Sequence, residues 1–282
     1  MFKTLKDAFH VTNSNIILAV PLILFLKIID LYSAYSLYNL DSNGKLLLAA
    51  VTILFMFGVL CSGWFYMVKK AVELSEKIFV MDSDRAKETL NLLKAIPEGI
   101  GKLFLPFVGA YIILFFVQLL TAPIVIWTGI HAIGMPDAET LQSIQNLAVS
   151  SSDAAASAFV DKMSPELLAF FGKWSLLLVL SVSLIMYILM FFVPEIVYKH
   201  HNPFVALFTS IKKLFCKFFS TFGLFLILWI LGIILLFINT FSLINPFAYW
   251  IISIITFWFM VYVTVTIFMY YKKCYIDEAD EQ

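Results

Sequence analysis

Charged residues are scarce in this chain. Asp, Glu, Lys and Arg make up 13% of its 282 residues, whereas soluble proteins carry about 25%. Hydrophobic residues make up 62% of the chain, and its mean hydropathy is +0.94. This composition excludes a soluble globular protein and predicts an integral membrane protein. The formal net charge is zero, so only the distribution of charge informs on partners, and nothing points to nucleic acid.

Cysteines are few and catalytic signatures are absent. Cys61, Cys216 and Cys274 show no CxxC spacing, so we expect free thiols and neither a disulfide framework nor a metal site. The chain has no HExxH, GxSxG, P-loop or dinucleotide glycine pattern. We therefore expect no cofactor and no enzymatic activity. Strict GxxxG is missing as well, so no dimer face is predicted.

What the chain does contain is long apolar runs. A helix of about 20 residues crosses the ~30 Å hydrocarbon layer, and lipid leaves the backbone no alternative to helix here. We predict one membrane domain, with an outer loop at 128–173, a helix start at Pro165 and a tail at 272–282. The N-terminal run is too long for a signal peptide and is predicted to be a retained span. The six predicted spans are residues 16–38, 46–68, 103–127, 174–193, 218–238 and 247–271.

The distribution of lysine predicts the orientation. Of the 19 basic residues, 15 lie in the N-terminal arm, the second and fourth connections and the tail. By the positive-inside rule these segments and both termini are cytoplasmic.

Residues 203–239 combine a basic amphipathic segment with the span that follows it. Lys212, Lys213 and Lys217 lie on its polar side at helical spacing, and apolar residues fill the other side. Such a helix lies in the membrane interface. Similar approaches precede the first and third spans. We predict an all-α protein whose six transmembrane helices form three hairpins, each preceded by a cytoplasmic-side amphipathic helix. Duplication and selection for topology both account for this repetition.

Membrane lipids are the expected partners, through their anionic headgroups. Each basic residue near an anionic leaflet contributes about 1 kcal/mol of attraction. Any positive-inside loop attracts lipid in this way, so specific recognition is a separate hypothesis. The predicted headgroup contacts are Lys94, Lys102, Lys212, Lys213 and Lys217.

Polar residues within the spans are the other candidates. Lys27 and Asp30 share a helix face in the first span and can pair. They are either part of a proton or ion relay, or a lysine that snorkels to the outer interface beside its partner. Gln118 in the third span is suited to bond a neighbouring helix or a polar substrate. At the end of the fourth span, an ion pair between Glu195 and Lys199 is favoured over a metal site.

Val193, Pro194, Glu195, Ile196 and Val197 form a short motif. Ala206, Leu207, Ser210 and Leu214 follow it and lead into an aromatic-rich span. This pattern resembles bacterial multi-pass membrane families of unknown function. It is also similar to the integral membrane domain fused to some glycerophosphodiester phosphodiesterases. The resemblance covers about residues 190–270. It implies a membrane platform and carries over no active site, since no phosphodiesterase domain accompanies it.

We therefore expect a non-enzymatic protein of the bacterial inner membrane. It would handle or organise lipids, or act as a partner subunit of another membrane protein. The alternative is a small secondary transporter or channel with a polar path near Lys27, Asp30 and Gln118. A membrane enzyme is the third hypothesis, and it requires Glu195, His200 and His201 to converge at one pocket.

Overall fold

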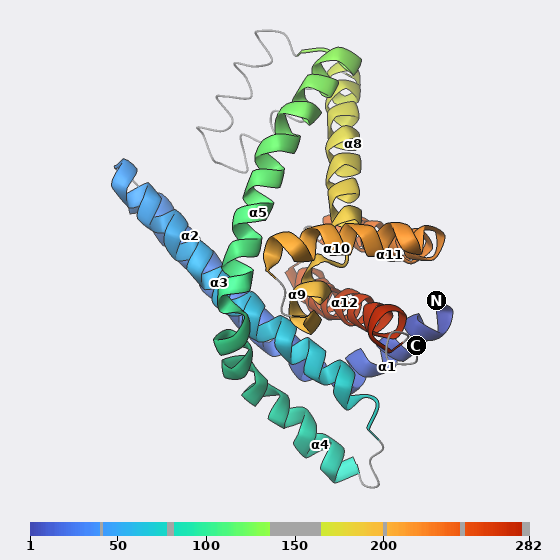
Figure 1. Ribbon diagram of the computed structural model, residues 1–282. Coiled ribbons are helices and arrows are strands. Elements are labelled where there is room, and N and C mark those ends of the chain that lie inside the picture. Colours follow the sequence, from blue (N-terminus) through green and yellow to red (C-terminus); the bar gives the residue numbers. More distant parts are fainter. Residues whose placement is uncertain (40–41, 78–81, 136–164, 200–201, 243–245, 278–282) are drawn as a thin grey trace. The chain divides into compact units, whose positions relative to one another are not determined.

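The computed structural model consists of α-helices joined by short turns (Figure 1). It describes residues 1–39, 42–77, 82–135, 165–199, 202–242 and 246–277, and no strand occurs among them. Five helices are long and apolar enough to cross a membrane, or six if the bent pair Phe2–Ser14 and Ile16–Tyr32 is one span. The prediction of an all-α membrane protein is confirmed at this level.

The chain divides into two compact units. Unit 1 comprises Met1–Ile113 and Tyr187–Gln282, and unit 2 comprises Leu114–Met186. The single membrane domain stays a prediction. Unit 1 contains α1 (Phe2–Ser14), α2 (Ala19–Asn39), α3 (Asn43–Leu74), α4 (Asp82–Asn91), the first part of α5 (Ala95–Ala132), α9 (Phe192–Lys199), α10 (Pro203–Cys216), α11 (Phe218–Ser242) and α12 (Pro246–Lys272).

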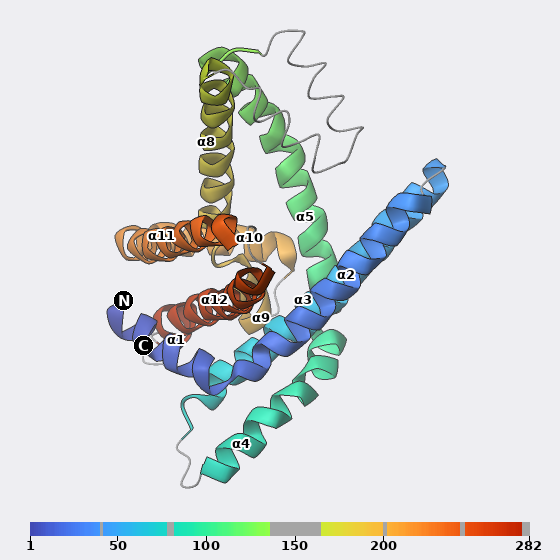
Figure 2. The same ribbon diagram turned by 180° about the vertical axis from the view of Figure 1, so that it is seen from behind.

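In unit 1, α12 packs against several other helices. It contacts α1, α2, α3, α9 and α11, and Figures 1 and 2 show α1 alongside it in both views. The ring of Phe65 on α3 stacks on Phe107 of α5 and on Phe268 of α12, at centroid distances of 5.6 and 6.0 Å. Stacked aromatic pairs of this kind add about 1 kcal/mol beyond burial. The rings therefore join three helices that are distant in sequence.

Two helices of unit 1 end in the same kind of break. After α1, Asn15 has φ −125° and ψ 47°, and after α10, Lys217 has φ −123° and ψ 41°. In each case the carbonyl oxygen accepts a hydrogen bond from the N–H three residues on, Leu18 at 3.0 Å and Ser220 at 3.1 Å. At the first break the chain turns by 78°. An amphipathic helix thus passes into an apolar one through the same local geometry twice.

A third break separates α9 from the helix before it, α8 (Pro165–Ile188). Pro194 accounts for this break, because proline has no N–H to donate and its ring clashes with the carbonyl four residues earlier in a continuous helix. The helix therefore stops at Ile188 and starts again at Phe192. This break turns the short α9 into a separate element, and it is α9 that carries Glu195.

Unit 2 consists of the second part of α5 and most of α8. Gly129 of α5 lies so close to the ring of Trp174 on α8 that a Cβ there would collide with it. At the end of α5, Gly134 adopts φ +100°, a left-handed conformation typical of helix ends. α8 begins at Pro165, as predicted. Much of the predicted outer loop, residues 136–164, lies outside the described residues.

Candidate functional site

A buried ion pair in unit 1 involves Glu195, whose side chain is fully buried on α9. Its Oε2 lies 2.6 Å from Lys213 Nζ on α10 and accepts a hydrogen bond from the Tyr271 hydroxyl on α12. The amino group of Lys213 also lies 2.6 Å from the Tyr271 hydroxyl oxygen and 4.6 Å from the centre of its ring. One carboxylate therefore ties together three helices. Lys199 is exposed, and its predicted ion pair with Glu195 stays a prediction.

The ion pair between Glu195 and Lys213 joins helices, but burying its charges costs desolvation free energy. Burial lowers the pKa of Lys213, and Glu195 only partly offsets this effect. Lys213 therefore gains less from its partner than it loses in leaving water. Its side chain is 15% exposed and paired with Glu195, and its role as a headgroup contact stays a prediction.

The other predicted headgroup lysines lie in more open surroundings. Lys94 and Lys212 are exposed. Lys102 is half-exposed and bonds to Glu98 at 2.6 Å and to the Tyr66 hydroxyl at 3.3 Å. Lys217 is partly buried at the break between α10 and α11, with its amino group 5.6 Å from the centre of the Tyr275 ring. Lys94 and Lys212 therefore have the freest access to a ligand outside the protein.

The polar residues predicted within the spans are divided between the two units, and each is described within its own unit. Lys27 and Asp30 form the predicted ion pair at 3.3 Å, but their side chains are 63% and 67% exposed on α2. Gln118 belongs to unit 2, where it is also exposed. His200 and His201 lie outside the described residues. Within the described part of the chain, no three His, Cys, Asp or Glu residues are placed to hold a metal ion.

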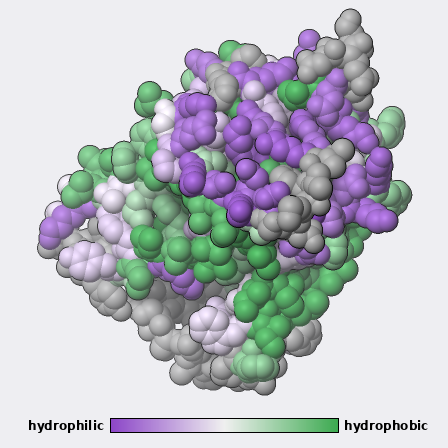
Figure 3. Space-filling view, turned by 90° about the horizontal axis from the view of Figure 1, so that it is seen from below, coloured by the Kyte–Doolittle hydropathy of each residue, from purple (hydrophilic) through white to green (hydrophobic). Residues whose placement is uncertain are grey.

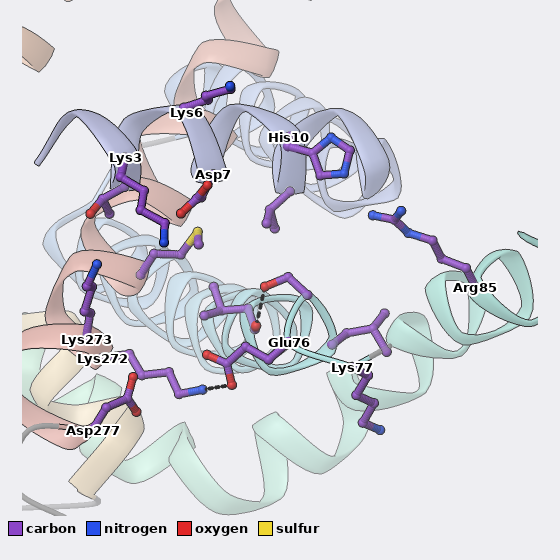
Figure 4. Close-up of a pocket in the computed structure, with 16 residues that line it drawn as sticks. Lys3, Lys6, Asp7, His10, Glu76, Lys77, Arg85, Lys272, Lys273 and Asp277 are labelled. Atoms are coloured by element: carbon purple, nitrogen blue, oxygen red, sulfur yellow. Dashed lines mark hydrogen bonds and ion pairs between the residues drawn. The ribbon is translucent and has the colours of Figure 1, made fainter. Parts of the chain in front are cut away.

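The described part of unit 1 contains a cavity of about 670 Å³ between α1, the end of α3, α4 and the end of α12 (Figure 4). Small-molecule sites commonly have volumes of about 300 to 1,000 Å³. The lining residues that carry charge or can be charged are Lys3, Lys6, Asp7, His10, Glu76, Lys77, Arg85, Lys272, Lys273 and Asp277. We call this space the basic cavity.

Positive charge predominates in the basic cavity. Six lysine or arginine side chains face three carboxylates, and His10 adds a further nitrogen ligand or donor. One cation is neutralised directly, because Lys272 pairs with Glu76. In the described structure the remaining five, Lys3, Lys6, Lys77, Arg85 and Lys273, form no ion pair. Cations that lack carboxylate partners in a concave space attract an anion from outside.

Figure 4 shows how these side chains are directed. Lys3 on α1 and Lys273 at the end of α12 extend toward the space between their helices, and Arg85 on α4 extends toward His10. Lys6 and Lys77 point away from it. In the space-filling view of Figure 3, hydrophilic side chains gather in one broad region of the face, and hydrophobic side chains border it. Lys3, Lys273 and Arg85 are therefore the cations best directed to reach a common ligand.

The sequence did not predict the basic cavity as a site. Lys3, Arg85 and Lys273 contributed only to the orientation, because they lie on three segments widely separated in the chain. Their convergence depends on α1 packing against α12, which no local pattern encodes. One signal was present: the lysine distribution predicts that all three segments lie at the same membrane boundary.

Comparison with known proteins adds no identity. The chain matches no protein-family model, no curated protein and no solved structure. Its class therefore follows from its own features: an all-α membrane protein with a basic cavity in unit 1.

Proposed function

We propose that this chain is a lipid-organising protein of the bacterial inner membrane that gathers anionic headgroups at its cytoplasmic side. The observation that carries the proposal is the set of basic side chains without carboxylate partners around the basic cavity. Anionic lipid headgroups are the most abundant anions at a cytoplasmic membrane surface. Each lysine or arginine there contributes about 1 kcal/mol of attraction.

The arrangement of α10 supports an interfacial position in this proposal. Its small residues Ala206 and Ser210 are buried against the protein, whereas Phe204 and Phe208 are 62% and 69% exposed. Exposed phenylalanines beside an exposed Lys212 are typical of a helix at the lipid boundary. We extend this role to α1 and to residues 92–102 before the third span, so that the six spans form three hairpins, each entered through a helix on the cytoplasmic surface.

The transport alternative has weaker support. A polar path requires Lys27, Asp30 and Gln118 to face an enclosed, water-filled space. Lys27 and Asp30 are instead exposed on α2, which is consistent with a lysine that snorkels to the interface. A partner subunit that covers this face remains compatible with the lipid-organising role.

Native mass spectrometry of the protein purified in a mild detergent tests the proposal. We expect several lipids to be retained, with anionic species enriched over their share in the source membrane. Retention of a small solute without lipid would favour transport, and a second polypeptide would favour the partner-subunit role. A protein that retains lipids in the proportions of the membrane would contradict the proposal.

A further inference from the structure

We propose that the basic cavity is a specific site for a phosphate-bearing anion, with Lys3, Lys273 and Arg85 as its ligand-contacting cations. This deepens the proposed function, because it rests on a cytoplasmic-side role for anionic ligands and names both the site and the chemical class. The inference differs from general lipid attraction in one respect: it concerns one cavity and not the summed charge of a surface.

The chemistry of the lining favours phosphate over other anions. A lysine ammonium binds phosphate as a point charge, and an arginine guanidinium offers a planar fork that matches two phosphate oxygens. Here such groups come from three elements and approach one space, with α1 supplying Lys3, α4 supplying Arg85 and the end of α12 supplying Lys273. A phosphate has two negative charges and several acceptor oxygens, so it can engage more cations at once than a carboxylate can. In Figure 4, Arg85 lies beside His10 and apart from Lys3 and Lys273, so it would contact another part of the same ligand.

The carboxylates and the volume of the cavity favour a ligand that carries hydroxyl groups in addition to phosphate. Its lining includes three carboxylates, Asp7, Glu76 and Asp277. Glu76 forms an ion pair with Lys272. Asp7 and Asp277 would repel a bare polyanion but can accept hydrogen bonds from hydroxyl groups. A volume of about 670 Å³ exceeds what one phosphate needs. The ligand class that fits is a phosphate joined to a hydroxyl-bearing group, such as glycerol or a sugar.

Two sources supply such a ligand: a lipid headgroup that enters from the membrane, or a soluble phosphate compound that enters from the cytoplasm. Both present the same phosphate group to the same cavity. Titration calorimetry with the full-length protein in a neutral detergent separates them. The three probes are a short-chain phosphatidate, a short-chain phosphatidylcholine and inorganic phosphate.

The decisive variant is Lys3→Ala combined with Lys273→Ala, which removes two cations from opposite sides of the cavity. Both side chains are exposed and without an ion pair in the described structure, so the fold should be retained, and thermal unfolding checks this. The matched control is Lys87→Ala combined with Lys199→Ala, which removes equal charge from exposed positions outside the cavity lining. A third variant, Arg85→Lys, keeps the positive charge but removes the planar guanidinium group that can bind two phosphate oxygens.

We expect the Lys3 and Lys273 variant to weaken phosphatidate or phosphate binding by about tenfold or more, and the control by about twofold at most. Arg85→Lys should show an intermediate loss. If the protein binds phosphatidate tightly and inorganic phosphate weakly, the ligand is a lipid headgroup. If the two affinities are comparable, the ligand is a soluble phosphate compound. Phosphatidylcholine should bind poorly.

Three outcomes would overturn one of the two proposals. Equal losses in both double variants would mean diffuse attraction, which removes the site but leaves the proposed function. Absence of binding by any phosphate probe, while anionic lipids co-purify, would have the same meaning. Binding of inorganic phosphate alone, with no anionic lipid retained by the protein, would support the site and remove the lipid-organising function.

Discussion

At the scale of single residues, the buried carboxylate of Glu195 makes the strongest prediction. Replacing Lys213 by methionine leaves this carboxylate in the protein interior without its cation. We expect Lys213→Met to lower the free energy of unfolding by about 3 kcal/mol or more, because a buried charge that loses its partner keeps its full desolvation cost. Thermal unfolding of the purified protein in detergent measures the change.

The exposed neighbour provides the control for this prediction. Lys212→Met should shift the unfolding temperature little, since Lys212 is exposed. Combining Lys213→Met with Glu195→Leu should recover most of the lost stability, because apolar replacements of a whole buried pair are often neutral. If the single and the double variant are equally unstable, the ion pair is not the cause.

The sequence predicted the ion pair between Lys27 and Asp30 but not the ion pair between Glu195 and Lys213. Lys27 and Asp30 are three positions apart on one helix, so their pairing follows from helical geometry. Glu195 and Lys213 are separated by the end of α9 and the start of α10. The sequence favoured Lys199 because it lies one helical turn from Glu195, whereas Lys213 reaches Glu195 because α10 packs against α9. Short-range spacing carries no information about such packing.

At the scale of elements, the contact between α3 and α5 depends on a glycine. A Cβ at Gly99 would lie 2.5 Å from Tyr66 Cβ and 2.7 Å from the Ser62 carbonyl oxygen. We expect Gly99→Ala to destabilise the protein by about 1 to 3 kcal/mol, because one of the two backbones must move. The measurement is again the thermal unfolding of the purified protein.

A glycine two positions further along gives the matched control. Gly101 has no atom within 4 Å of an added Cβ, so Gly101→Ala should be neutral or stabilise the helix by up to about 1 kcal/mol. If both substitutions behave alike, close packing of α5 on α3 is not what Gly99 provides.

Apolar run lengths predicted where helices lie but not all of their ends. α5 starts at Ala95, well before its apolar run at residue 103, and α3 continues to Leu74. Hydropathy marks the part of a helix that suits lipid, whereas the hydrogen-bonded backbone continues into polar residues without interruption. The break before α9 is different, because Pro194 gives it a local chemical cause that the sequence displays.

At the scale of the whole molecule, the orientation is open to a direct test. Single cysteines are introduced by Ser42→Cys or Lys87→Cys, both exposed positions, in a chain whose native cysteines are replaced by alanine. A maleimide that cannot cross membranes should label the first variant in intact spheroplasts. It should label the second only after the membrane is opened.

Labelling of both variants from the same side would contradict the predicted orientation, and with it the cytoplasmic position of the basic cavity. The spread of lysines along the chain predicts this orientation. It does not predict which of the basic segments meet, because that depends on how the helices pack within unit 1.

The packing of α1 against α12 also has a consequence for biogenesis. α1 rests on α12, which follows it in the chain only after several other helices, so α1 reaches this packing partner only after those helices have been synthesised. Lys3 and Lys273 come together only then. A chain arrested before α12 would therefore lack the basic cavity.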